Sequence, residues 1–149
     1  MVQVDLDPST HRLHACAQVN FVPLEDAPNV TFELNNNLTP DADPKLGLKV
    51  TDGAGNTLPT QRFQQEGSLR VHYERPLPKG QSTALVMEYS GVLVSGENQP
   101  VEGLKLGYVG EEVSYLLYPG RWLPVSGYPV DRFTAELSVT VPQGMRVVG

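Results

Sequence analysis

Hydrophobic and polar residues alternate with a period of two along most of this chain. The alternating runs cover residues 2–7, 13–21, 30–34, 46–50, 69–74, 85–90, 113–117 and 133–141. This period is typical of β-strands with one buried face. No window of a dozen residues free of glycine and proline has apolar residues at helical spacing, so we expect strands and no substantial helix.

Strands that are polar on one face have one face in water, which favours antiparallel sheets. The predicted fold is therefore all-β, an antiparallel β-sandwich or a saddle-like open barrel, in a single domain spanning residues 1–149. The chain stops soon after a new apolar run begins at Met145. We therefore expect a domain truncated at its C-terminal side, with an exposed edge strand or apolar patch there that could support dimerisation.

Glycine and proline punctuate the strands. The chain has 14 glycines and 13 prolines, spread along its length rather than gathered in a tail. Residues 7–10 and 51–56 have the composition of tight turns, and residues 96–103 are expected to form a long surface loop. Asp41 and Asp43 lack the glycine and closing glutamate of a calcium loop, so an acidic surface loop is the favoured interpretation.

The charge balance excludes some classes of function. A net charge of −6, from 17 acidic and 11 basic residues, disfavours nucleic-acid binding. No apolar stretch is long enough to span a bilayer, and the N-terminus lacks the features of a signal peptide. The single cysteine, Cys16, is expected to be a small strand residue rather than a nucleophile or a metal ligand.

The three histidines do not form a recognisable metal motif. His11 and His14 are three positions apart, so on a strand their side chains would point to opposite faces. Two exposed histidines at a strand edge are the favoured interpretation, and His72 is expected to be solvated on a polar face. Without a Gly-x-Ser-x-Gly or phosphate-binding motif, the residues themselves reveal no catalytic constellation.

Aromatic residues gather before and within a proline-rich segment. Trp122 is expected to be a core anchor under this turn, with its indole N–H satisfied locally, and ligand contact is the alternative. Arg121 is expected to anchor the same turn through a charge-assisted hydrogen bond. The nearby tyrosines could contribute to a recognition surface or simply end strands.

The whole chain resembles the N-terminal β-domain of the membrane alanyl aminopeptidase family, whose members are gluzincin zinc metallopeptidases. The resemblance rests on segments 6–8, 32–35, 76–80 and 88–93, and most strongly on the segment after Arg121. The family has an arginine, an apolar spacer, Pro-Cys-x-Asp-Glu-Pro and then a strand ending in Val-Pro. Here Arg121, Pro124 and Pro129 occupy the corresponding places, and a run ending at Val141 and Pro142 follows.

The chain also departs from the family pattern. Residues 125–128 replace the Cys-x-Asp-Glu element. Where the family commonly places Gln or Glu that hold the free amino group of the substrate, this chain offers Tyr115 or Leu116. The resemblance therefore implies that Tyr115 and Tyr118 lie near substrate, while Arg121, Trp122, Pro124 and Pro129 form a structural motif.

The residues that perform the chemistry of the family are missing from the sequence. His-Glu-x-x-His, the downstream glutamate and Gly-x-Met-Glu-Asn do not occur. The resemblance therefore implies a non-catalytic domain, without a cofactor of its own, within a larger zinc aminopeptidase, the parent. It would wall the active-site cleft and pack on the catalytic domain of the same chain, while the parent removes N-terminal residues from peptide substrates.

Two alternatives remain open from the sequence. One is a stand-alone immunoglobulin-like binding or adhesion module, and the other is an unrecognised hydrolase. The sequence does not give the localisation, and an exported or periplasmic parent is one interpretation, in which case its leader has been removed.

Overall fold

The computed structural model describes residues 1–38, 48–94, 106–127 and 130–149. Within these ranges the regular structure consists of ten strands and two short 3₁₀ turns, η1 and η2. In chain order the elements are β1 (Val2–Asp7), β2 (Arg12–Phe21), β3 (Ala27–Glu33), η1 (Asn36–Leu38), β4 (Lys49–Asp52), β5 (Thr60–Phe63), β6 (Ser68–Leu77), β7 (Thr83–Val92), β8 (Gly107–Tyr108), β9 (Tyr115–Leu116), η2 (Pro119–Arg121) and β10 (Leu137–Thr140). The expected surface loop at 96–103 and the pair Asp41 and Asp43 lie outside the described residues.

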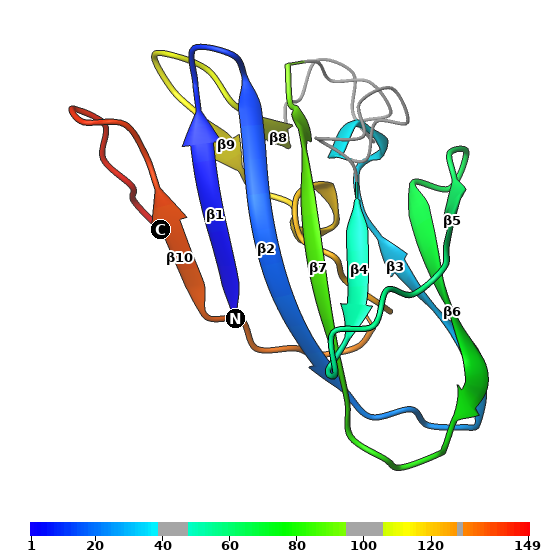
Figure 1. The fold of residues 1–149 in the computed structure, drawn as a ribbon. Helices are drawn as coiled ribbons and strands as arrows, with labels where there is room; N and C mark the ends of the chain where they lie inside the picture. Colours follow the sequence, from blue (N-terminus) through cyan, green and yellow to red (C-terminus); the bar gives the residue numbers. More distant parts are fainter. Residues whose placement is uncertain (39–47, 95–105, 128–129) are drawn as a thin grey trace.

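The strands form three open sheets (Figure 1). The largest sheet has the order β10-β1-β2-β7-β4, the second has the order β3-β6-β5, and β8 pairs with β9. The centre of the large sheet is the antiparallel pair of β2 and β7, which stays in register from Arg12 opposite Val92 to Phe21 opposite Thr83. The predicted all-β open sandwich is thereby confirmed.

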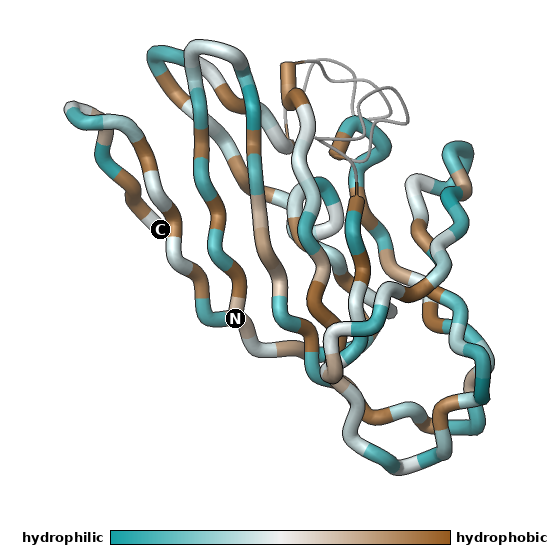
Figure 2. The backbone as a smooth tube through the Cα atoms, viewed as in Figure 1, coloured by the Kyte–Doolittle hydropathy of each residue, from teal (hydrophilic) through white to brown (hydrophobic). Residues whose placement is uncertain are grey.

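The core lies between the large sheet and the second sheet. Alternate residues are buried in the first half of β2 and in the middle of β7. Figure 2 shows hydrophobic and hydrophilic residues alternating along the strands of the large sheet. The fully buried side chains include Leu13, Ala15, Ala17, Leu69, Val71, Leu85, Met87 and Tyr89. Burying such side chains supplies the main driving force for folding, at about 1.5–3 kcal/mol for each large one.

Aspartates organise two of the turns that the sequence predicted. The Asp7 carboxylate accepts hydrogen bonds from the backbone N–H and hydroxyl of Ser9 and from the hydroxyl of Thr10, at 2.6–3.1 Å. The Asp52 carboxylate accepts from the backbone N–H groups of Ala54 and Asn56, and Gly55 has a φ of +88°. Both turns therefore have the side-chain to backbone bonds that favour Asp at such positions.

The edge strand β10 differs from the expectation in two ways. It pairs with β1 in a parallel direction, with Val2 opposite Leu137 and Asp5 opposite Thr140, so the sheet is not wholly antiparallel. It also begins at Leu137 rather than at Phe133. Just before the strand, the Glu136 carbonyl oxygen accepts a 2.8 Å hydrogen bond from the Val2 N–H, at the first residue of β1.

The 3₁₀ turn η1 packs closely onto β7. Gly91 is buried, and a Cβ atom at this position would overlap the backbone carbonyl of Asn37. The Arg62 guanidinium donates to the carbonyl oxygens of Leu34 and Asn35, at 2.9 and 2.7 Å, just before η1. These contacts fix the connection that leaves β3 against the large sheet.

Candidate functional site

The proline-rich segment forms a compact turn stabilised by its own backbone. In η2 the N–H groups of Arg121 and Trp122 donate to the carbonyl oxygens of Tyr118 and Pro119, at 3.0 and 2.9 Å. The N–H of Leu123 also donates to Pro119, at 2.7 Å. Pro119 suits this place because a proline at the first position of a helical turn gives up no hydrogen bond that the turn needs.

Trp122 anchors this turn in the core, as the sequence predicted. Its side chain is buried, and its carbonyl oxygen accepts a 2.8 Å hydrogen bond from the buried Tyr89 hydroxyl of β7. Burial raises the pKa of the Tyr89 phenol well above its usual value, with a smaller contribution from Cys16. The expected local partner of the indole N–H is not found, because Nε1 of Trp122 is buried without a hydrogen bond in the part of the chain that the structure describes.

A short bridge joins the segment to β3. The backbone groups of Glu33 and Val125 exchange hydrogen bonds of 2.7 and 3.2 Å. Gly120 is buried beside Glu33, and a Cβ atom there would lie 2.9 Å from Glu33 Oε2 and 3.2 Å from the Tyr118 ring. Glu33 therefore lies against the turn, although no chemical signal in the sequence distinguishes it from other strand glutamates.

The ribbon of β8 and β9 leads into this turn and exposes one apolar side. Tyr115 pairs with Tyr108 across the ribbon, and its side chain is 41% exposed. Val113 and Leu117 are exposed by 43% and 64%, and alternate positions on an extended chain share a side. We call Val113, Tyr115 and Leu117 the apolar stripe.

The structure distributes the predicted site residues between surface and interior. Of the two tyrosines predicted to lie near substrate, Tyr115 is on the exposed stripe, whereas Tyr118 is half-buried beside Gly120. Arg121 and the buried Pro124 follow in the same turn. Pro129 lies outside the described residues.

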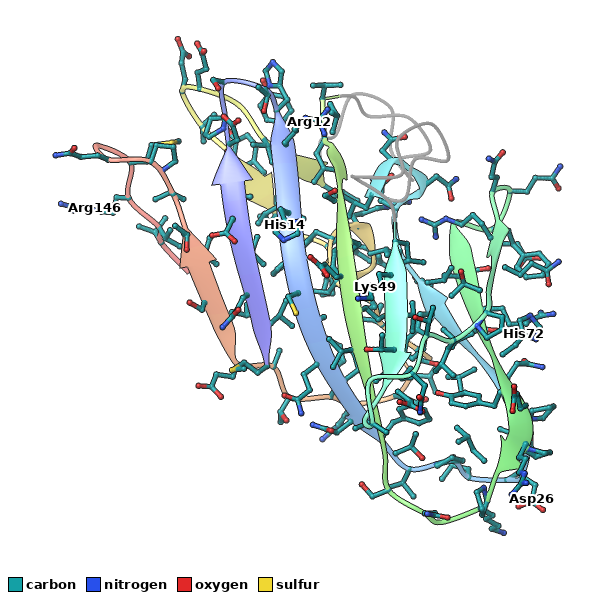
Figure 3. The ribbon with its side chains drawn as sticks, in the orientation of Figure 1. Arg12, His14, Asp26, Lys49, His72 and Arg146 are labelled. Carbon is teal, nitrogen blue, oxygen red and sulfur yellow. The ribbon has the colours of Figure 1, made fainter. Side chains whose placement is uncertain are left out.

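The three histidines are far from forming a common site. His14 is exposed on the outer face of β2, with Nε2 at 3.9 Å from Glu88 Oε1 of β7, and Figure 3 shows His72 on the other sheet. The prediction for His11 was wrong, because it precedes β2 in a turn with a φ of +56° and is partly buried. Its Nδ1 lies 2.7 Å from the Val109 carbonyl oxygen, a contact that ties this turn to the segment after β8.

Neither a metal site nor a membrane helix is found among the residues that the structure describes. In residues 1–38, 48–94, 106–127 and 130–149, no three His, Cys, Asp or Glu side chains are grouped so that they could hold an ion. The described donors therefore do not fit a catalytic zinc, which needs three protein ligands. None of the helical turns in these ranges has the length and hydropathy that crossing a bilayer requires.

One small polar cavity borders the turn. It has a volume of about 150 Å³ and is lined by residues 35–37, residues 64–67 and Arg121. The Asn36 side-chain N–H donates to the Gln64 carbonyl oxygen at 2.7 Å, which holds the two walls together. Amides, the Glu66 carboxylate and one guanidinium can bind polar groups, but this set lacks an arrangement of nucleophile and base.

Comparison with known proteins gives a clear answer for the fold alone. No protein-family model matches the sequence. No curated protein matches it by sequence either.

Solved structures do match. An M1 zinc metallopeptidase of Deinococcus radiodurans, solved as a mutant bound to a Tyr-Ser-Ala substrate, is 20% identical with a TM-score of 0.70. A two-domain M1 zinc metallopeptidase mutant bound to L-tryptophan is 18% identical with a TM-score of 0.67.

The matches cover very different shares of the two chains that are compared. Both matches extend over 95% of this chain but only 31% of the other. The chain thus spans about a third of the length of the proteins that it matches, and the resemblance to this family is confirmed at the level of the fold. The chain has the β-fold of one part of an M1 zinc metallopeptidase.

Proposed function

We propose that residues 1–149 are the non-catalytic N-terminal β-domain of a larger zinc aminopeptidase. In this proposal the domain walls the active-site cleft and packs on the catalytic domain of the same chain, while the parent releases N-terminal residues from peptides. The observation that carries the proposal is the coverage, because 95% of this chain matches 31% of a zinc metallopeptidase.

The apolar stripe is the surface proposed to meet the catalytic domain. Three neighbouring apolar side chains are exposed by 41–64% beside a turn that Trp122 anchors in the core. Fully burying a side chain of this kind stabilises an association by roughly 1.5–3 kcal/mol. Exposed apolar groups that cluster in this way mark interaction surfaces more often than isolated ones do.

The parent, rather than this domain, would supply the zinc. Metal-assisted peptide hydrolysis requires an ion with an open coordination position, held by side chains that the described ranges do not bring together. Tyr115 and Tyr118 are proposed to line the cleft near the substrate. Their phenols would supply hydrogen-bonding groups and aromatic surface, not ligands or a general base.

The first experiment measures zinc and activity in the purified 149-residue chain. We expect zinc well below one ion per chain and no release of dye from aminoacyl anilides. The reading frame after Gly149 should encode His-Glu-x-x-His, and the catalytic part encoded there, added in trans, should bind this chain. One tightly held zinc per 149-residue chain would contradict the proposal, as would a reading frame without that motif.

A matched pair of variants tests the docking surface. Leu117→Lys places a charge on the apolar stripe and should weaken binding to the catalytic part by about tenfold or more. Leu24→Lys is the control, because Leu24 is 83% exposed on the loop between β2 and β3, away from the ribbon (Figure 1). Equal binding by the two variants would contradict the proposed face.

Substitution in the whole enzyme tests the role of the tyrosines. Tyr115→Ala should raise KM for peptides while zinc content and the melting temperature of the domain stay unchanged. A structural role alone would lower the melting temperature and leave KM in place.

A further inference from the structure

The outer edge of β10 has backbone groups available for pairing. β10 borders β1 on one side, and none of the described strands lies on its other side. The Val2 N–H donates to the Glu136 carbonyl oxygen at 2.8 Å. In a parallel ladder, alternate residues bond to the neighbouring strand, so Ser138 also faces β1, while Leu137 and Val139 direct their N–H and C=O groups to the open edge.

The chain after β10 turns back toward this edge. The Met145 N–H donates to the Pro142 carbonyl oxygen at 3.1 Å, and Gly144 has a φ of +97°, which permits a tight reversal. In Figure 1 the red segment after the reversal runs back beside β10. Val147 and Val148 of this segment are exposed by 51% and 86%.

Alternate residues of β10 direct their N–H and C=O groups to the open edge, and this alternation matches a hairpin with a four-residue loop. If residues 142–145 form the loop, Val141 lies opposite Arg146 and Val139 opposite Val148. Both would be hydrogen-bonded pairs, which agrees with the N–H and C=O groups of Val139 pointing to the open edge. Ser138 and Thr140 cannot supply the hydrogen-bonded pairs of this hairpin, because their N–H and C=O groups already face β1.

The same register fixes which side chains become buried. Directly opposite residues of an antiparallel pair share a face. Val139 packs against the core, so Val148 would be placed over the core beside it. Val147 would lie on the outer face with Thr140, which is exposed.

We propose that residues 145–149 are an edge strap, a strand that closes onto β10 in this register and keeps the large sheet from pairing with a second copy of the chain. In the structure the strap is open. Residues 142–145 reverse the chain, but residues 145–149 form no ladder with β10. Closing it removes an edge that promotes association. This inference does not depend on the proposed function.

Amide exchange in the 149-residue chain, followed by NMR, tests the strap. The N–H groups of Val139 and Val148 should exchange at least about tenfold more slowly than that of Val147, which points away from β10. A chain that lacks residues 145–149 should lose the protection at Val139 and form dimers as its concentration rises.

Two single variants provide the control. Val148→Lys should restore fast exchange at Val139, whereas Val147→Lys should leave the protection unchanged. Far-UV circular dichroism checks that both variants fold, which is expected because both side chains are exposed in the open form. Fast exchange at Val139 in the unaltered chain would overturn the proposal, as would protection that grows with protein concentration, because a second copy would then occupy the edge.

Discussion

The Tyr89 hydroxyl donates a hydrogen bond to the Trp122 carbonyl oxygen across 2.8 Å inside the core. It links the centre of β7 to the turn that follows η2, two segments separated by 33 positions in the chain. Since both groups are buried, neither can exchange its partner for water. The bond therefore holds the turn in place on the large sheet.

Replacing Tyr89 with Phe should lower the free energy of unfolding by about 1–3 kcal/mol, because the buried carbonyl of Trp122 loses its donor. Urea unfolding followed by the fluorescence of Trp122, the single tryptophan, measures the change. An unchanged midpoint would mean that water reaches the carbonyl in the native protein.

Tyr73 on β6 differs from Tyr89 in the surroundings of its hydroxyl group. Its hydroxyl is buried without a hydrogen bond among the described residues, and burial, with a contribution from Asp52, raises the phenol pKa to about 12. Tyr73→Phe removes an unsatisfied polar group and should raise the free energy of unfolding by about 1 kcal/mol at neutral pH.

The same substitution should change the response to alkali. Above pH 10 the phenol ionises in the unfolded chain but not in the folded one, so the unaltered protein loses stability as the pH rises from 10 toward 12. The Phe variant should lose less over this range. Parallel curves for the two proteins would show that the phenol is hydrated in the native state.

Gly91→Ala tests the contact between β7 and η1. A Cβ atom at this position overlaps the backbone of Asn37, which cannot move without displacing η1. We expect a loss of about 3 kcal/mol, at the upper end of the usual cost of overpacking, because the atom that is met belongs to the backbone. Gly53→Ala is the control, because its Cβ would meet Ala84 at an ordinary 3.6 Å, and thermal unfolding of the two variants should differ clearly.

Asp52 should titrate below its usual range. The side-chain hydrogen bond from Asn56, and then the backbone N–H groups of the turn, hold the pKa of its carboxyl below 3.8. The turn is therefore stabilised above the pKa of the unfolded carboxyl, and this contribution is lost as the pH falls through the folded pKa. Carboxyl ¹³C shifts measure both states, and Asn56→Ala should move the pKa back up while that of Asp7 stays in place.

The long strands could be predicted because alternation and burial agree within them. In β2 and β7 every second residue enters the core, so the period alone identifies both strands and their inner faces. β5 and the two-residue β8 could not be predicted in this way. Such short strands are defined by a partner, and the sequence does not say which segment pairs with which.

The same reason explains the errors at β10 and His11. Residues 133–141 alternate, yet β10 extends only from Leu137 to Thr140, where β1 lies beside it. His11 leaves the strand because the reversal after Asp7 needs a residue with positive φ before β2 begins. Of the candidate site, the burial of Trp122 was expected because it is the single tryptophan in a proline-rich turn, whereas the approach of Glu33 to Gly120 depends on contacts between distant segments.

The pairing of β1 with β10 has a consequence for biosynthesis. Val2 leaves the ribosome before its neighbour Leu137, which is added 135 residues later. At typical translation rates this interval is on the order of ten seconds, during which one side of the first strand lacks its final neighbour. The outer edge of β1 therefore promotes association with other chains until β10 has emerged and paired with it.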